Sequence, residues 1–157
     1  MKKILLVAIM AMAGISLAVA QPRAIGGRLG YGLEVSYQHS VGANMVQLEV
    51  GVPGFASLEA ACTHDWIDPF NATVPWSQKG EWHWSLGVGG AIGGDLGFHA
   101  GYLGAVGRVG IEYDFWFPLQ LSFDFRPMLA MVFNKDAVGF GFDGYAGAIG
   151  LGVRYLF

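Results

Sequence analysis

The residues that come closest to a catalytic arrangement are a histidine and a serine two positions apart, His83 and Ser85, with an acid, Asp95, ten positions after the serine. A serine becomes a nucleophile for acyl transfer when a histidine accepts its proton and an acid orients that histidine. The relay also needs the serine within hydrogen-bond reach of the histidine and an oxyanion site beside it. Trp82 and Trp84 alternate with His83 and Ser85, which turns the pair towards the inside of the predicted barrel. We therefore prefer to interpret His83 and Ser85 as a structural pair on one strand face.

Charged residues of both signs are a second source of chemistry. They occur singly, between small or apolar neighbours, rather than in runs. A charge inside a protein persists only when it is paired and hydrogen-bonded. We therefore predict a network in which the three C-terminal arginines bind acids across an interior. Its candidate members are Arg28, Glu34, Glu49, Glu59, Arg108, Glu112, Asp114, Asp124, Arg126 and Arg154.

Other chemistries have little support. His39, His64 and His99 lie on separate segments without ligand spacing, so we predict no metal site. The stretch 87–90 begins like a nucleotide-binding fingerprint but lacks its third glycine, and we expect no cofactor. The single cysteine, Cys62, cannot form an internal disulfide. Because there is no basic cluster, we do not expect nucleic acid as a partner.

The N-terminus has the features of a removable secretory leader. Lys2 and Lys3 follow the initial methionine, an apolar run covers 4–17, and a small-residue cleavage site lies at 18–20. We expect residues 1–20 to be a signal peptide and residues 21–157 to form one mature domain of 137 residues, with seven basic and twelve acidic side chains. An N-terminal membrane anchor is the alternative, although the apolar run is short for a span.

The composition is unusual for a soluble domain. Glycine makes up 25 of 157 residues, a share of about 16% against a usual value of about 7%, and only 13% of residues are charged. Yet no stretch after the leader has 18 consecutive apolar residues, so no helical span is predicted. High hydrophobicity without such a span leaves strands as the way through a bilayer. A soluble β-sandwich is the main alternative.

Alternation of apolar and polar residues, which indicates strands, recurs along the mature chain. We identify seven such segments, over 25–38, 45–52, 55–67, 82–92, 98–115, 119–126 and 139–157. A barrel with both termini on one side needs an even number of strands. The missing strand is expected within 21–38, which could hold two strands, or in the predicted loop over 128–139. The fold prediction is an all-β, antiparallel transmembrane β-barrel of eight strands.

The two faces of these segments differ in chemistry. One face carries bulky apolar and aromatic residues, and the other carries glycine, alanine, serine and the single charges. An eight-stranded barrel has little room for large side chains inside, so we expect the bulky face to point outward and the small, charged face to line the lumen. Aromatic girdles at two membrane interfaces would explain the residues near strand ends. These are Trp66, Trp76, Trp82, Trp84, Tyr113, Phe115, Trp116 and Phe117.

The last nine residues alternate most regularly, and the chain stops on an aromatic residue. The apolar positions are Ile149, Leu151, Val153, Tyr155 and Phe157. A strand that ends in phenylalanine resembles the C-terminal signal by which bacterial outer-membrane barrels are recognised for assembly. The resemblance implies that the barrel-assembly machinery is a partner and that outer-membrane lipid surrounds the barrel.

The chain also resembles a known group over nearly its whole mature length. Residues 23–39, the stretches 110–113 and 117–127 and the terminal strand are similar to small, porin-like outer-membrane β-barrel proteins of the Bacteroidetes. This resemblance implies a fold and a Gram-negative outer-membrane location, because members of the group mostly have no assigned activity. The spacing of His83, Ser85 and Asp95 loosely resembles that of outer-membrane lipid A deacylases, but the resemblance covers only two residues and a spacing.

These observations lead to three functional hypotheses. We favour a non-enzymatic outer-membrane barrel that acts as a structural or interaction module, with a lumen filled by side chains and loops that meet ligands or partners. The second hypothesis is a lipid A-modifying hydrolase, which would require His83 and Ser85 to face lipid. The third is a narrow channel, in which the charges of the lumen would line water instead of pairing.

Overall fold

The computed structural model describes residues 22–69, 79–97, 100–134, 136–144 and 148–157 of the chain. The predicted signal peptide, Trp76 and His99 lie outside these ranges. The described residues form ten strands. They are β1 (Pro22–Leu29), β2 (Gly32–Val41), β3 (Asn44–Pro53), β4 (Ser57–Pro69), β5 (Gly80–Asp95), β6 (Gly101–Phe115), β7 (Gln120–Phe125), β8 (Met128–Phe133), β9 (Val138–Asp143) and β10 (Ile149–Leu156).

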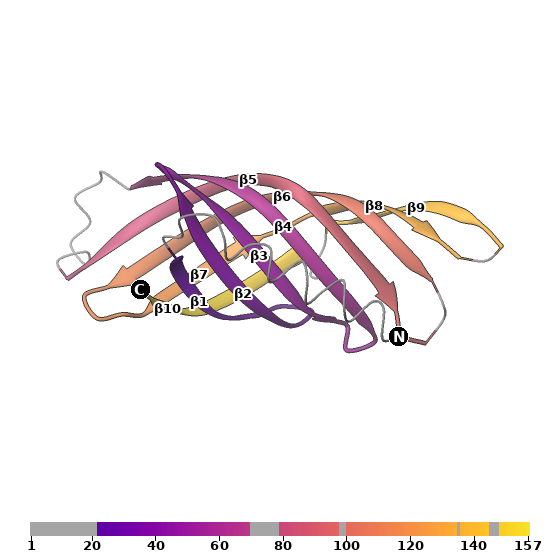
Figure 1. The fold of residues 1–157 in the computed structure, drawn as a ribbon, viewed down its shortest axis with the longest axis horizontal. Coiled ribbons are helices and arrows are strands. Elements are labelled where there is room, and N and C mark those ends of the chain that lie inside the picture. The colour runs from indigo at the N-terminus through magenta and orange to yellow at the C-terminus, as the bar shows by residue number, and fades with distance from the viewer. Residues whose placement is uncertain (1–21, 70–78, 98–99, 135, 145–147) are drawn as a thin grey trace.

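The ten strands make eight spans of one closed antiparallel barrel (Figure 1). Strands β1 to β6 pair in chain order. Strands β7 and β8 both pair with β6 and together form the seventh span. Strands β9 and β10 form the eighth span, in which β9 pairs with β8 while β10 pairs with β7 and with β1. The pairing of β10 with β1 closes the barrel, as the prediction of an eight-stranded barrel requires.

The strand missing from the sequence pattern lies near the N-terminus. Residues 21–38 were expected to hold either one or two strands, and β1 and β2 occupy this region, joined by a turn at Gly30 and Tyr31. The prediction of two strands there is confirmed. The next two turns, between β2 and β3 and between β3 and β4, contain Gly42 and Gly54. These residues have φ of 64° and 62°, a backbone conformation that glycine adopts without strain.

Two sequence predictions near the C-terminus are wrong. The region 128–139, predicted as a loop and named as the second candidate for a missed strand, is not a loop throughout. Residues 128–133 form β8, which continues β7 along the same neighbour and so adds no further span. The region 139–157 is not one regular strand. In β9 the outward residues have even numbers, whereas in β10 they have odd numbers, so the alternation changes phase between the two strands.

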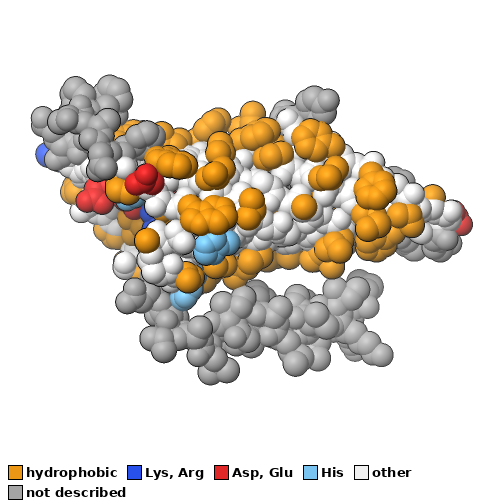
Figure 2. Space-filling model, turned by 90° about the horizontal axis from the view of Figure 1, so that it is seen from above, with side chains coloured by type: hydrophobic (Ala, Val, Ile, Leu, Met, Phe, Trp, Pro, Cys, Tyr) orange, Lys and Arg blue, Asp and Glu red, His pale blue; other side chains and the backbone are white. Residues whose placement is uncertain are grey.

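The faces of the wall follow the predicted alternation. Along β10 every residue from Ile149 to Tyr155 is alternately exposed and buried, and β7 shows the same pattern. The exposed positions are bulky and apolar, whereas the buried ones are small or polar. In Figure 2, hydrophobic side chains cover the middle of the visible face and acidic side chains lie towards its two ends. The barrel is therefore apolar outside and polar inside.

The barrel has two unlike ends. The start of β1 and the end of β10 lie together, with Ala24 opposite Leu156, and we call this the terminal end. The turns between β1 and β2 and between β8 and β9 lie at the opposite end, which we call the turn end. There the β8–β9 hairpin extends well beyond the β1–β2 turn (Figure 1).

Candidate functional site

The interior of the barrel is filled mainly by polar side chains. Its apolar cluster is small, with Ala61, Ala91 and Val106 at the centre and Met128 packed against them. Most of the largest fully buried side chains are arginine, glutamine or acidic residues, among them Arg28, Arg154, Gln38 and Glu112. The alternation of each strand turns these residues inward, so the sequence pattern itself creates a charged interior.

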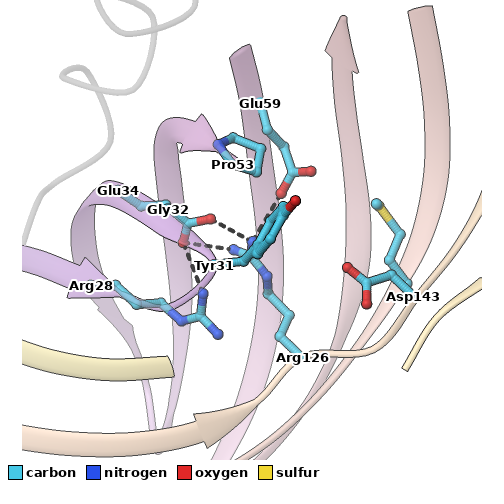
Figure 3. A pocket seen from close by; sticks show the side chains of 9 residues that line it. Arg28, Tyr31, Gly32, Glu34, Pro53, Glu59, Arg126 and Asp143 are labelled. Carbon is cyan, nitrogen blue, oxygen red and sulfur yellow. Dashed lines mark hydrogen bonds and ion pairs between the residues drawn. The ribbon is translucent and has the colours of Figure 1, made fainter. Parts of the chain in front are cut away.

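A group that we call the mouth cluster lies towards the turn end. Arg126 binds three acids from three different strands. Its Nη2 lies 2.7 Å from Glu34 Oε1 and 2.9 Å from Glu59 Oε1 (Figure 3), and its Nη1 pairs with Glu49. Arg28 is the second arginine, and its Nη1 donates to Glu34 Oε2 over 3.1 Å. The mouth cluster thus links β1, β2, β3 and β4 to the residue that follows β7.

Arg28 also connects the mouth cluster to the centre of the lumen. Its Nη2 donates to Asp124 Oδ1 over 2.7 Å, and its Nε donates to both carboxylate oxygens over 2.9 and 3.1 Å, a two-pronged arrangement that suits a guanidinium and a carboxylate. Arg108, which is fully buried, donates from Nη1 to Asp65 Oδ2 over 2.9 Å, and its Nη2 lies 3.6 Å from Asp124 Oδ2. These pairs tie together strands that are not direct neighbours, β1 with β7 and β4 with β6.

A cluster at the terminal end, which we call the base cluster, mixes charges with amides. Arg23 Nη1 donates to Glu112 Oε2 over 2.8 Å, and its Nη2 lies 3.2 Å from Asp114 Oδ2. Gln38 Nε2 donates to Glu112 Oε1 over 2.7 Å, and Gln120 Nε2 donates to Asp114 Oδ1 over 2.9 Å. The base cluster is therefore held by both ion pairs and neutral donors.

A chain of amides joins the two clusters. Gln38 Nε2 donates to Gln47 Oε1 over 3.0 Å, and Gln47 Nε2 donates to Glu49 Oε1 over 2.6 Å. Since Gln38 also binds Glu112 of the base cluster and Glu49 binds Arg126 of the mouth cluster, the network is continuous from one end of the lumen to the other.

All ten residues predicted for the network carry their side chains into the interior and belong to it. One of them departs from the expected pairing. Arg154 donates to neutral groups, Ser36 Oγ, Ser122 Oγ and Gln120 Oε1, over 2.7 to 3.0 Å, while its nearest carboxylate, that of Glu49, lies 3.8 Å away. Arg154 is therefore solvated by hydroxyl and amide groups rather than by an acid.

Sequence reasoning missed two charged members of the network. Asp65 lies on the inner face that alternation assigns to its strand, and this signal was available. Arg23 lies two positions before the outward-facing Ile25, so alternation predicts that its side chain also points outward. It turns inward because the pairing of β1 with β2 shifts register between Pro22 and Ala24, and a bulge of this kind leaves no mark in the alternation.

The interior carries more acid than arginine. Among the described residues, five arginines face seven carboxylates in the network. His83 lies close to this excess, with Nδ1 3.6 Å from Asp114 Oδ2. Any path for ions through this lumen would therefore favour cations.

The candidate relay is not assembled in this geometry. Ser85 is buried in the lumen, and its Oγ has no hydrogen-bond partner within the described part of the chain. His83 approaches Glu81 and Asp114 rather than Ser85, and Asp95 lies near the far end of the same strand, where its carboxylate accepts from the Gly97 amide. Both His83 and Ser85 lie on the inner face of the barrel wall.

Aromatic rings gather at the terminal end, where Trp82, Tyr113 and Phe115 are half-buried and Trp116 and Phe117 are exposed. Trp82 contacts Tyr113, Phe115 contacts both Tyr113 and Phe117, and ring centroids lie 4.7 to 5.0 Å apart. Trp116 packs against Phe117 at 5.0 Å. A cluster of this kind at one rim is typical of the interface between a bilayer and water.

The C-terminal strand completes the wall beside these rings. Ile149, Leu151, Val153, Tyr155 and Phe157 are all exposed on the outer face. The amide of Phe157 donates to the carbonyl of Arg23 over 3.1 Å, so the last residue is bound to the first strand. The C-terminus thus forms part of the seam at which the barrel closes.

The described residues include no group of three or more histidines, cysteines or acids placed to hold a metal ion. Nor does that part of the chain hold a helix that is long and apolar enough to cross a membrane. Comparisons with models of protein families, with curated proteins and with solved structures found no match. The β-barrel implied by the resemblance is confirmed, while membership of the Bacteroidetes group stays a prediction.

Proposed function

We propose that this protein is an integral outer-membrane β-barrel that acts as a structural or interaction module, with a closed lumen and with loops that meet ligands or partners. The observation that carries the proposal is the polarity of the barrel. Arginines and acids are buried inside, while side chains such as Leu29, Phe123 and Leu151 are exposed around the wall.

This polarity suits a bilayer better than water. A soluble barrel buries its large apolar residues and exposes its charges, because apolar surface in water is costly. A closed barrel pairs the backbone groups of its wall strands internally, which is the condition for strands to lie in lipid. The aromatic cluster at the terminal end supports the same environment.

The filled lumen argues for a closed module rather than a pore. Eight strands enclose little space, and here the buried arginines and acids occupy it with a network that runs between both ends. The expected partners are outer-membrane lipid around the wall and the barrel-assembly machinery, which would bind the C-terminal strand. No enzymatic activity belongs to the proposal.

Cell fractionation with gel analysis tests this proposal. Full-length protein should appear in the outer membrane, and unboiled samples should migrate differently from boiled ones because a folded barrel resists SDS. A variant that lacks Tyr155-Leu156-Phe157 should lose both properties. A protein that fractionates as soluble and shows no mobility change on boiling would contradict the proposal and favour a secreted β-sandwich.

One observation favours the channel hypothesis: the lumen contains more acids than arginines. Planar-bilayer recording of the purified barrel tests it, with the protein-free bilayer as baseline. We expect conductance at the baseline, because the network is closed at Arg126. Steady, cation-selective current would overturn the closed-lumen proposal and support a narrow channel.

The hydrolase hypothesis is tested at Ser85. We expect Ser85→Ala to leave the acylation pattern of lipid A unchanged, because Ser85 Oγ is buried in the lumen and receives no contact from His83 in the described structure. The Ser57→Ala variant, which changes a serine that donates to the Pro53 carbonyl near a turn, is a matched control. A change in lipid A confined to Ser85→Ala would support the hydrolase.

A further inference from the structure

The β8–β9 hairpin leaves one sheet edge open. Within the described part of the chain, β9 pairs with β8 on one side and with no strand on the other. This edge, which we call the β9 edge, contains the sequence Val138-Gly139-Phe140-Gly141-Phe142-Asp143. It has no proline and no lysine, and these are the residues with which proteins usually block an edge strand.

The ladder of the hairpin shows which backbone groups the β9 edge offers. At the turn, Asn134 N donates to Ala137 O over 3.0 Å, so this pair is hydrogen-bonded. Hydrogen-bonded and non-hydrogen-bonded pairs alternate along an antiparallel ladder. Val138, Phe140 and Phe142 therefore fall on non-hydrogen-bonded pairs with β8, and their N–H and C=O groups point to the open edge.

The outer face of the hairpin continues the apolar wall. A row of exposed residues crosses four strands in register, from Ile92 on β5 through Leu103 and Met131 to Phe140 on β9. Exposure is highest at the end of this row, where Phe140 is 80% exposed. The row ends at β9 because β9 is the last strand of the sheet in this direction.

These features conflict with an isolated barrel in lipid. If the wall lies in a bilayer, as proposed above, the apolar outer face of the hairpin lies in or beside the apolar phase. Unpaired backbone groups are not tolerated there, and an open sheet edge exposed to lipid does not occur. An edge that no described strand covers is therefore a template for pairing with a further strand.

We propose that the β9 edge pairs with the β9 edge of a second copy of this chain, in an antiparallel arrangement about a two-fold axis at Phe140. This inference rests on the membrane location proposed above. Phe140 then faces Phe140 of the second copy, and Val138 faces Phe142, so every outward apolar side chain of β9 gains an apolar partner. The two Asp143 carboxylates lie at opposite ends of the paired strands.

Symmetry also favours a second copy over another partner. The same edge of two copies can pair antiparallel, because both copies offer identical backbone groups. Such a two-fold contact uses both edges, so no open edge is left to which a third copy could add. The glycines on the other face leave room, because a Cβ at Gly139 would meet no atom within 4 Å.

Disulfide cross-linking in isolated outer membranes tests the pairing. Cys62, which is exposed, is first replaced by alanine to remove the native thiol. In a hydrogen-bonded antiparallel pair the two Cα atoms lie about 5.5 Å apart, which is within disulfide range. Phe140→Cys should therefore shift to twice the monomer mass on oxidation, whereas Phe142→Cys should stay monomeric, because its two copies would lie more than about 13 Å apart.

A second cysteine pair tests the register of the two strands, and a cysteine outside the proposed interface controls for cross-links formed by random collision. Chains with Val138→Cys and chains with Phe142→Cys, when expressed together, should cross-link to each other. Leu86→Cys, an exposed position on the outer face of β5, should not cross-link. Dimers at Leu86 as abundant as those at Phe140, or none at Phe140 and none in the mixed pair, would overturn the pairing.

The same samples distinguish this inference from the proposed function. If the chain lies in the outer membrane and changes mobility on boiling but does not cross-link, the two-fold pairing fails and the proposed function stands. If the chain is absent from the membrane fraction, both fail.

Discussion

Two parts of the same barrel, the closed wall and the β8–β9 hairpin, are built from similar residues in different ways. In β10 the residues alternate between lumen and exterior, and each strand edge is paired. In β9, which continues the same span, nearly every residue is exposed and one edge has no partner among the described strands. The comparison teaches that the wall is built around an enclosed charged network, whereas the hairpin encloses little.

The largest expected effect is at the centre of the enclosed network. Arg28→Met removes the two-pronged partner of Asp124, which is completely buried, and one partner of Glu34. Breaking a buried pair by removing one partner costs about 3–5 kcal/mol, and here Asp124 would keep only Arg108, whose Nη2 lies 3.6 Å from its Oδ2. Urea unfolding of the barrel in lipid vesicles, followed by tryptophan fluorescence, should show this loss.

The double replacement Arg28→Met with Asp124→Asn is the control for this prediction. It removes the unpaired charge, so it should recover part of the lost stability. A single variant as stable as the unchanged protein would mean that the network does not stabilise the wall.

Two glycine-to-alanine variants, one in the wall and one in the hairpin, should show a smaller difference in stability. A Cβ at Gly150, on the inner face of β10, would overlap the guanidinium of Arg28, whereas one at Gly139 in the hairpin would meet nothing within 4 Å. Gly150→Ala should cost about 1–3 kcal/mol, as overpacking of a filled interior does, and Gly139→Ala should be close to neutral. Equal effects in the same unfolding measurement would remove the distinction between wall and hairpin.

The smallest effect is expected at the border between the two parts. Tyr102, which pairs with Val132 of the hairpin, donates its hydroxyl to Glu59 Oε2 over 2.6 Å. Because Arg126 still binds Glu59, Tyr102→Phe should cost only about 1 kcal/mol. A loss as large as that of Arg28→Met would show that the network depends on the hairpin side as much as on the wall.

The wall was largely predictable from the sequence because its side chains alternate. Alternation places Arg28 and Glu34 on one face, and charges on the crowded face of a narrow barrel must pair. Alternation does not determine which arginine binds which acid. Arg154 is bound by hydroxyl and amide groups because Ser36, Ser122 and Gln120 happen to surround it, which depends on the register between distant strands.

The hairpin was not predictable in the same way. Residues 128–133, Met-Leu-Ala-Met-Val-Phe, are apolar throughout, so a period of two carries no signal there. Pro127 lies just before them and has no amide hydrogen, which favours a break in the strand. The break is real, since neither Arg126 nor Pro127 belongs to a strand, but β8 then continues along the same neighbour.

The most direct test of the central claim is to measure what surrounds the outer face of the wall. In the Cys62→Ala background, nitroxide labels are placed at Phe123 and Leu151, two exposed residues that face each other in register, and at Asp136 near the tip of the hairpin. The barrel is then reconstituted in lipid vesicles. Collisions of each label with dissolved oxygen and with a water-soluble nickel complex are measured by electron paramagnetic resonance.

The account predicts that the labels at Phe123 and Leu151 collide with oxygen, which concentrates in lipid, and hardly at all with the nickel complex. The label at Asp136 should show the opposite preference. If all three labels collide equally with the nickel complex, the apolar face of the wall lies in water and the membrane account is wrong.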